Sequence, residues 1–313
     1  MVRVRRQIGA EEIQFGDSDL RQESTEGSME FERKQVTVAV LDTGVGRHPD
    51  LRGKVVGFRD FVGNRNLMYD NNGHGTHICG IICGSGGMSA GRLRGMAPDA
   101  CLAVGKVLDE KGDGMTEHML DGINWVLENR ERMNIRILNI SVGIGELNDK
   151  KKEDALRQKI NQVWESGVVV VCAAGNKGPG NGSISSVGGS EKVITVGCHD
   201  GKYCLDNPKR CATYSGRGEL LSIIRKPDIV APGTDIRSCN ANYHKEGPYI
   251  AKSGTSMATP IVAGAIALLL QQEPELTNEE VKRKLTYTAD DLGLPWNQQG
   301  WGMVNVKKLL ERY

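Results

Sequence analysis

The sequence predicts an α/β protein built on a doubly wound, mostly parallel β-sheet with helices on both faces. Short runs of valine, isoleucine and leucine recur without alternating polar positions, which is typical of strands buried on both faces of a parallel sheet. Between these runs lie stretches whose apolar residues are spaced three and four positions apart, as in amphipathic helices. Strands that alternate with helices over 313 residues predict this fold class.

Residues 1–35 are polar and weakly patterned, and GDSDLRQESTEGS (16–28) resembles a surface arm. We therefore expect a short N-terminal arm over 1–35 and a single domain over 36–313, a length at which one large core is sufficient. The first residues are basic but no apolar segment follows them, so they do not resemble a secretory signal. This pattern indicates a cytoplasmic protein, although a processed secreted form would look the same.

The expected strands are the apolar runs at 36–42, 101–108, 135–143, 167–176, 192–198 and 226–233. The expected helices are 74–84, 117–130, 153–167, 277–289 and the long apolar segment that follows Ser256. Gly167 provides a C-terminal stop signal, and Thr277 and Glu280 have the spacing of a capping box. In such a sheet, ligands bind at the carboxyl ends of the strands.

Charge and composition exclude several classes of partner. The chain has 40 basic and 39 acidic residues, so nothing indicates binding to nucleic acid or to an anionic membrane. No apolar run reaches the length expected of a membrane-spanning helix.

The eight cysteines indicate a reducing compartment. Cys83 lies four residues beyond Cys79, but such a pair is not a zinc site without further ligands. Cys204 and Cys211 flank a polar loop and could form a disulfide if oxidised. Four cysteines lie within apolar runs, where they are expected to be buried as small hydrophobic residues: Cys79, Cys101, Cys172 and Cys198.

Three reactive side chains stand at the ends of expected elements. Asp42 closes the first strand, His74 opens the first helix, and Ser256 lies at the start of the long apolar helix. Taken singly, each has an ordinary explanation as a turn residue, a loop residue or a helix cap. Together they follow the order Asp, His, Ser, which is one of the known chain orders of a catalytic triad.

Three blocks of sequence carry a resemblance to a known family: VAVLDTGVGRHPDL (38–51), NGHGTHICGII (72–82) and SGTSMATPIVAG (253–264). On these blocks the chain resembles the subtilisin-type serine peptidases, or subtilases, over about residues 36–310. GFRDFV (57–62), CGSGGMSAGRLRGMAP (83–98) and KPDIVAPG (226–233) are most similar to the intracellular AprX-type branch of bacterial subtilases.

The resemblance implies a serine endopeptidase of broad specificity that forms an acyl-enzyme. Asp42, His74 and Ser256 would form the triad, and Asn176, at the end of a buried strand, matches the asparagine of the oxyanion hole. The substrate would be a peptide or protein that binds in extended form between two backbone edges. The residues matching these edges and the first specificity pocket are Gly112, Asp113, Gly114, Ser141, Val142, Gly143 and Gly175. A protein inhibitor similar to a propeptide would be a further partner.

The resemblance also raises the question of calcium. Asp50 matches one calcium ligand of the secreted subtilisins, but the usual calcium loop is replaced by CGSGGMSAGRLRG (83–95), which contains no carboxylate. Because a hard cation needs several oxygen ligands, we expect no required cofactor, keep calcium as an open alternative and assign no metal ligands.

The sequence bears on three alternatives to a peptidase. A regulatory pseudoprotease would have lost triad residues, and all three are present. A peptide ligase or other acyl transferase on the same fold would keep the triad, so the sequence does not separate it from a hydrolase. A nucleotide-binding sheet protein would need a glycine-rich phosphate loop after the first strand, and none follows it.

Overall fold

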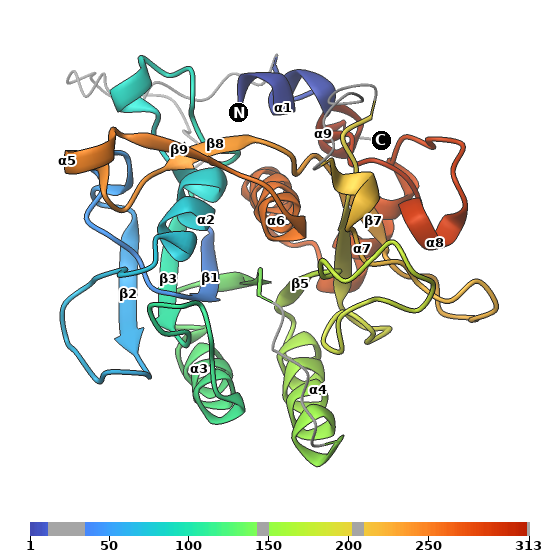
Figure 1. Cartoon of the computed structure of the whole chain (residues 1–313), viewed down its shortest axis with the longest axis horizontal. Coiled ribbons are helices and arrows are strands. Elements are labelled where there is room, and N and C mark those ends of the chain that lie inside the picture. The colour runs from blue at the N-terminus through green and yellow to red at the C-terminus, as the bar shows by residue number, and fades with distance from the viewer. Residues whose placement is uncertain (12–34, 143–149, 202–209, 312–313) are drawn as a thin grey trace.

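The computed structural model describes residues 1–11, 35–142, 150–201 and 210–311 (Figure 1). Within this part of the chain, seven parallel strands form one sheet in the order β2-β3-β1-β4-β5-β6-β7. The strands are β1 (Thr37–Asp42), β2 (Val55–Asp60), β3 (Cys101–Lys106), β4 (Ile135–Ile140), β5 (Val169–Ala173), β6 (Ile194–Cys198) and β7 (Ile229–Ala231).

Helices cover both faces of the sheet. Helices α2 (His74–Cys83) and α6 (Thr255–Gln272) pack against each other on one face, while α3 (Thr116–Asn129) and α4 (Lys150–Glu165) pack against each other on the opposite face (Figure 1). The predicted doubly wound α/β fold is therefore confirmed. Because the chain returns across the sheet to add β4 beside β1, the carboxyl end of β1 lies at the switch point where such folds place their ligands.

Helix α6 forms the centre of the core. Among the described residues it alone is long and apolar enough to cross a membrane by length and composition, but 83% of it is buried inside the structure. Burial on all sides is what a core helix shows, and it explains why α6 has no clear polar face.

Smaller elements complete the fold. Strands β8 (Ile236–Cys239) and β9 (Tyr249–Lys252) form an antiparallel pair that leads directly into α6. Helix α7 (Asn278–Tyr287) begins with the predicted capping box, in which Thr277 and Glu280 bond to each other's backbone. The remaining helices are α5 (Tyr243–Glu246), α8 (Trp296–Gln299) and α9 (Val306–Leu310).

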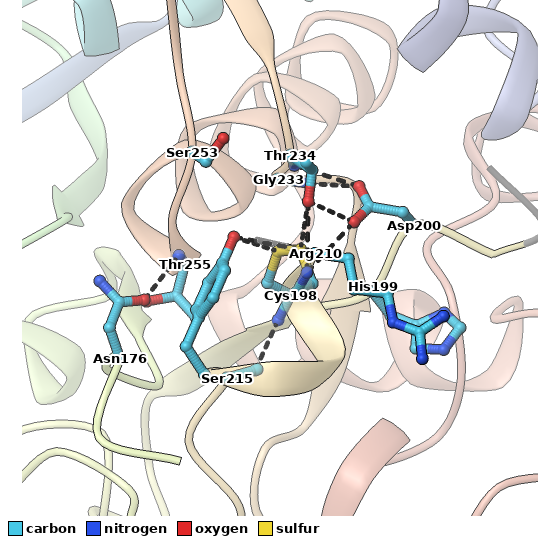
Figure 2. Close-up of a disulfide and its surroundings, with 12 residues drawn as sticks. Asn176, Cys198, His199, Asp200, Arg210, Ser215, Gly233, Thr234, Ser253 and Thr255 are labelled. Carbon is cyan, nitrogen blue, oxygen red and sulfur yellow. Dashed lines mark hydrogen bonds between the residues drawn. A yellow bond between two sulfur atoms is a disulfide. The ribbon is translucent and has the colours of Figure 1, made fainter. Parts of the chain in front are cut away.

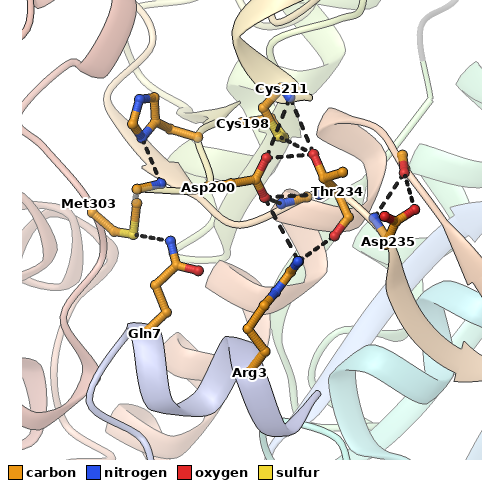
Figure 3. A network of polar contacts seen from close by, with 12 residues as sticks. Arg3, Gln7, Cys198, Asp200, Cys211, Thr234, Asp235 and Met303 are labelled. Atoms are coloured by element: carbon orange, nitrogen blue, oxygen red, sulfur yellow. Dashed lines mark hydrogen bonds and ion pairs between the residues drawn. A yellow bond between two sulfur atoms is a disulfide. The ribbon is translucent and has the colours of Figure 1, made fainter. Parts of the chain in front are cut away.

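The first ten residues pack against the body of the protein. Residues Val2–Gln7 form helix α1, and Met1, Val4, Ile8 and Ala10 are buried in the main core. On the other side of the helix, the Arg3 guanidinium donates to the carbonyl of Thr234 (Figure 3). The surface arm expected at 16–28 lies outside the described residues, and the division at residue 35 stays a prediction.

The bonding state of one cysteine, Cys198, differs from the expected one. Cys198 forms a disulfide with Cys211, so the prediction that Cys198 is a free buried thiol is wrong, and Cys211 is not the partner of Cys204. Cys204 itself lies outside the described residues. The pairing follows from the fold, because Cys198 ends β6 and the chain returns to the same place at Cys211.

Candidate active site

The carboxylate of Asp42 and the imidazole of His74 form a hydrogen-bonded pair. Asp42 is the last residue of β1 and is fully buried, whereas His74 is the first residue of α2 and keeps 23% of its side chain exposed. His74 Nδ1 lies 2.8 Å from Asp42 Oδ1 and 3.0 Å from Oδ2. Since a carboxylate can only accept, Nδ1 carries the proton and the neutral imidazole presents Nε2 as a base.

The pair shifts the acidity of the imidazole. Burial lowers the pKa of His74, but the charge and the hydrogen bond of Asp42 outweigh burial and raise this pKa above its ordinary value. The positive charge of Lys252, at the end of β9, acts in the opposite direction. The imidazole is therefore placed to accept a proton and to hold it as a stabilised imidazolium.

A single carboxylate, Asp70, joins the turn after β1 to the start of α2. Asp70 accepts hydrogen bonds from the Thr43 hydroxyl at 2.9 Å, from Gly73 N at 2.7 Å, and from the backbone and hydroxyl of Thr76 at 2.9 and 2.6 Å. Thr43 in turn accepts from Gly75 N. These bonds fix the two segments that carry Asp42 and His74 relative to each other.

Lys106, the last residue of β3, is a second hub and is 1% exposed. Its ammonium donates to the Thr43 carbonyl at 2.8 Å, the Asn71 side chain at 2.9 Å and the Leu108 carbonyl at 2.8 Å. Burial lowers the pKa of Lys106, and the neighbouring carboxylates, Asp70 foremost, counteract this. One buried cation thereby ties together the turn after β1, the loop before His74 and the loop after β3.

Ser256 is the second residue of α6 and is partly exposed, as the sequence predicts. The helix is preceded by Gly254, whose φ of 153° and ψ of 163° lie in a region used almost only by glycine. At this helix end, Thr255 N donates to Asn176 Oδ1 and Met257 N donates to the carbonyl of Gly254, each at 3.0 Å.

Asn176 is held by the residue before Ser256 (Figure 2). Its Oδ1 accepts from both the backbone N–H and the hydroxyl of Thr255, each at 3.0 Å. Because the oxygen is occupied by these two donors, the Nδ2 group is turned away from them and is available to donate to another acceptor.

The two halves of the site meet through packing between α2 and α6. His77, one turn after His74, is buried, and its Nε2 donates to the carbonyls of Ile236 and Ile250 at 2.9 and 3.1 Å. These bonds fix α2 to the β8–β9 pair that leads into Ser256. Burial is the main cause that lowers the pKa of His77 to about 3, so this imidazole stays neutral.

The two segments expected to border a bound peptide follow β3 and β4, on either side of β1. Residues 109–113 form a tight turn in which Asp109 N donates to the carbonyl of Asp113, and Gly112 has a φ of 84°. Asp113 and Gly114 are exposed after this turn.

On the opposite side, Ser141 is buried and accepts from the Asn139 amide, while Val142 is half-buried. Gly175 lies at the end of β5 with a φ of 94°. Gly143 lies outside the described residues. These segments begin where β3 and β4 end, on the two sides of β1, and Val107 N and Leu108 N donate to the carbonyl of Asp42.

The residues around Asp50 do not fit a calcium ion. Its carboxylate accepts from the Met88 backbone at 3.0 Å, the Ser85 hydroxyl at 3.3 Å and the Tyr249 hydroxyl at 2.5 Å. The other groups close enough to share an ion are His48 and Cys239, a nitrogen and a sulfur. Calcium binds six to eight oxygen atoms, and here protein donors already hold the only carboxylate of the cluster.

Sequence reasoning assigned no role to Asp70, Lys106 or Thr255. Asp70 stands two residues before the block NGHGTHICGII, in an Asp-Asn-Asn-Gly segment that is a signal for a side-chain-capped turn. Lys106 interrupts an otherwise apolar strand, which is a signal for a buried and fully paired charge. Thr255 gave no signal beyond its place before Ser256.

Comparison with known proteins agrees with this geometry. The subtilase family matches residues 33–302. Serine protease AprX of Bacillus subtilis (strain 168) is 43% identical over 294 residues, covering 88% of this chain, and the chain spans 66% of that protein. Subtilisin of Bacillus pumilus is 35% identical over 303 residues, with 95% of this chain and 98% of that protein covered.

Solved structures give the same result. Sphericase superposes with a TM-score of 0.75 at 31% identity, covering 87% of this chain and 91% of its own. The S41 psychrophilic protease superposes with a TM-score of 0.74 at 31% identity, with 88% and 92% covered.

Proposed function

This chain belongs to the subtilase family and is a subtilisin-type serine endopeptidase, and we propose that it cleaves peptide bonds through Asp42, His74 and Ser256. The observation that carries the proposal is the bond of 2.8 Å between His74 Nδ1 and the buried Asp42 carboxylate. This bond leaves Nε2 as the base, and it connects a residue at the switch point of the sheet to a helix packed against that of Ser256.

In the first half of the reaction, Ser256 Oγ attacks the carbonyl carbon of the scissile bond while His74 Nε2 takes the hydroxyl proton. The C=O bond becomes a C–O⁻ single bond in the tetrahedral intermediate. When this intermediate collapses, the C–N bond breaks and the imidazolium gives its proton to the leaving amine. Asp42 keeps the imidazole in the required tautomer and stabilises its charged form.

The oxyanion of the intermediate is stabilised by Asn176 Nδ2 and by N–H groups at the start of α6. The support for this role is the orientation of the amide, because Thr255 occupies its oxygen and leaves Nδ2 as the free donor. Loss of the corresponding donor in a subtilisin lowers kcat by about 10²–10³-fold.

In the second half, water replaces the departed amine and His74 again acts as the base, so that hydrolysis of the acyl-enzyme regenerates Ser256. We propose that the substrate chain lies extended between Asp113–Gly114 and Ser141–Val142, pairing mainly through its backbone. This mode implies a broad preference for side chains, and we propose that the reaction requires no cofactor.

A cytoplasmic location is part of the proposal. Its support is that five of the described cysteines are buried free thiols, which suits a reducing compartment, while Cys198 and Cys211 are bridged. Fractionation of the cells that produce the protein, followed by detection of the chain, would test this location.

The triad is tested by labelling the full chain with a fluorophosphonate and measuring the intact mass, alongside turnover of an unselective peptide library. We expect one adduct on Ser256 and none on Ser256→Ala, which should remain folded by circular dichroism. Ser166→Ala, directly after α4 on the opposite face of the sheet, is the matched control and should keep the adduct. Normal cleavage by Ser256→Ala would contradict the proposal, and products joined to an added amine would indicate acyl transfer instead.

A further inference from the structure

The Cys198–Cys211 disulfide lies near the segment that leads into Ser256, and Figure 2 shows Cys198 with Gly233, Ser253 and Thr255 of this region. Cys198 ends β6, and both cysteines are almost completely buried. A side-chain carbon built onto Gly233 would lie 2.4 Å from Cys198 Sγ and 2.6 Å from the carbonyl oxygen of Gly254. Gly233 therefore lies between the disulfide and the turn that leads into Ser256.

Gly233 and its neighbours support that turn through hydrogen bonds. Gly254 N donates to the carbonyl of Gly233 at 3.0 Å, and Asp235 N donates to the Ser253 hydroxyl at 2.9 Å. Displacement of Gly233 would thus be passed to Gly254, then to Thr255 and Ser256.

The surroundings of the two sulfur atoms are closely packed (Figure 3). The Tyr214 hydroxyl lies 3.7 Å from Cys198 Sγ and 3.6 Å from Cys211 Sγ, and the Thr234 hydroxyl lies 3.5 Å from Cys211 Sγ. Asp200 fixes this group from the other side, because it accepts from the backbones of Gly233 and Thr234 at 3.2 and 3.1 Å. Two separate thiols could not occupy this space without moving a neighbour.

The other described cysteines make this disulfide unusual. Each of them is buried and unpaired, as in proteins of a reducing compartment, where a disulfide is usually transient, catalytic or redox-sensing. They are Cys79, Cys83, Cys101, Cys172 and Cys239. A bridge at one place, beside the nucleophile turn, therefore indicates regulation rather than general stabilisation.

A metal ion explains the same residues less well. Asp200 could join the two sulfur atoms as a third ligand. However, its Oδ1 already accepts from Gly233 and Thr234, and its Oδ2 accepts from the Thr234 hydroxyl and from Cys211 N. An ion would have to displace these donors.

We propose that Cys198 and Cys211 form a reversible thiol–disulfide modification site that controls the peptidase activity assigned above, on which this inference rests. A thiol reductant transfers two electrons and two protons, so that the S–S bond breaks, two cysteine thiols form and two reductant thiols become one disulfide. A small disulfide oxidant reverses the reaction: the Cys198–Cys211 bond forms and the oxidant is released as two thiols.

Reduction is expected to lower the rate of the chemical step. The freed sulfur atoms move apart to van der Waals contact and displace Gly233 or Thr234, which shifts the segment leading into Ser256. Because small misplacements of reacting groups strongly reduce rates, we expect kcat to fall by at least about threefold while KM changes little.

The experiment equilibrates the full chain in buffers with graded ratios of reduced to oxidised glutathione. Each sample is divided between a peptide-hydrolysis assay, fluorophosphonate labelling of Ser256, and acid quenching with alkylation and mass mapping of the cysteines. The expected result is a fall of kcat and of labelling rate with the same midpoint as loss of the Cys198–Cys211 bond.

Variants locate the effect. Cys198→Ser and Cys211→Ser should have low activity that no longer responds to glutathione. Cys101→Ser, a buried thiol at the opposite end of the sheet, and Cys204→Ser should both keep the response. If Cys198→Ser and Cys211→Ser do not fold, the native chain still tests the inference, because its activity can be compared with the mass-mapped state of the two cysteines at each glutathione ratio.

The outcomes are distinct. Constant activity while the bond opens and closes, or two thiols that stay alkylatable at every ratio, would overturn the inference and leave the peptidase intact. Loss of the response in Cys204→Ser would also overturn it, because a different pair would then be responsible. A folded chain that neither labels nor cleaves at any ratio would contradict the proposed function and this inference together.

Discussion

Thr255 donates twice to the side-chain oxygen of Asn176, once through its backbone and once through its hydroxyl, with both distances 3.0 Å. The residue that precedes the nucleophile therefore sets the direction in which the amide of Asn176 can donate. Positioning of the nucleophile and stabilisation of the oxyanion depend on the same turn.

Replacing Thr255 by valine should lower kcat by about two- to tenfold, with KM nearly unchanged, because one neutral hydrogen bond that orients Asn176 is lost. The change is smaller than that expected for Asn176→Ala, since the backbone N–H of Thr255 remains. Steady-state kinetics measure the effect. Thr259→Val, which removes a buried hydroxyl one turn later in α6, is the control and should keep its kcat. An unchanged kcat in Thr255→Val would show that the hydroxyl does not orient Asn176.

Activity should fall as the pH drops through the pKa of His74, because only the neutral imidazole accepts the proton of Ser256. Asp42 raises this pKa, so Asp42→Asn should move the acid limb of kcat/KM to lower pH and reduce kcat, by about 10⁴-fold if it behaves like the triad of another serine protease fold. Asp154→Asn, exposed on α4, should leave the profile unchanged. An acid limb that stays in place in Asp42→Asn would contradict the pairing.

The same shift affects stability. An imidazole whose pKa is higher in the folded than in the unfolded chain adds stability that is fully present below about pH 6.5, and this contribution is lost as the pH rises through the folded pKa. Urea unfolding of the native chain and of His74→Ala across this window, in the Ser256→Ala background to prevent self-digestion, would reveal it as a difference that shrinks with increasing pH.

Tyr249, rather than calcium, is expected to stabilise Asp50. Tyr249→Phe should lower the free energy of unfolding by about 1–3 kcal/mol, because the buried carboxylate loses a hydroxyl donor. Tyr287→Phe, whose side chain is largely exposed, is the matched control. A chelator should change the Tm equally in the native chain and in Asp50→Asn. A chelator effect that disappears in Asp50→Asn would show that Asp50 does bind a cation.

Arg3 is expected to link α1 to the segment behind the nucleophile turn. Its guanidinium donates to the Thr234 carbonyl and lies 3.9 Å from the Asp200 carboxylate. Arg3→Met should lower the Tm by about 2–3 °C, the shift that a loss of about 1–2 kcal/mol produces in a domain of about 300 residues. Arg6→Met, on the same helix but paired with the exposed Glu11, should have no effect. Equal Tm values for the two variants would exclude the link.

Much of the fold could be predicted because the pattern that identifies each central strand lies within a few neighbouring residues. The apolar run at 36–42 became β1 (Thr37–Asp42), and the capping signals at Thr277 and Glu280 mark the start of α7 as expected. In both cases, neighbouring residues alone determine the structure.

Other features depend on contacts between distant parts of the chain. The edge strand β2 (Val55–Asp60) is only partly buried and lacks a continuous apolar run. Helix α1 alternates valine with arginine, and its place follows from packing against residues near the other end of the chain. The disulfide could not be read either, because Cys204 is closer to Cys211 in sequence than Cys198, while the fold brings Cys198 to it.

Helix α6 both fills the core and carries Ser256, the proposed nucleophile, in its first turn. Two parts of this protein therefore differ in how many substitutions they tolerate: the exposed loops near the site and the buried helix α6. Asp113 and Gly114 are exposed and are proposed to border the substrate, so libraries at these positions are expected to change specificity with little loss of folded protein. Libraries in α6 are expected to lose most clones to unfolding before their specificity can be tested. Engineering of this peptidase should accordingly begin at the rim of the site and leave the helix behind Ser256 unchanged.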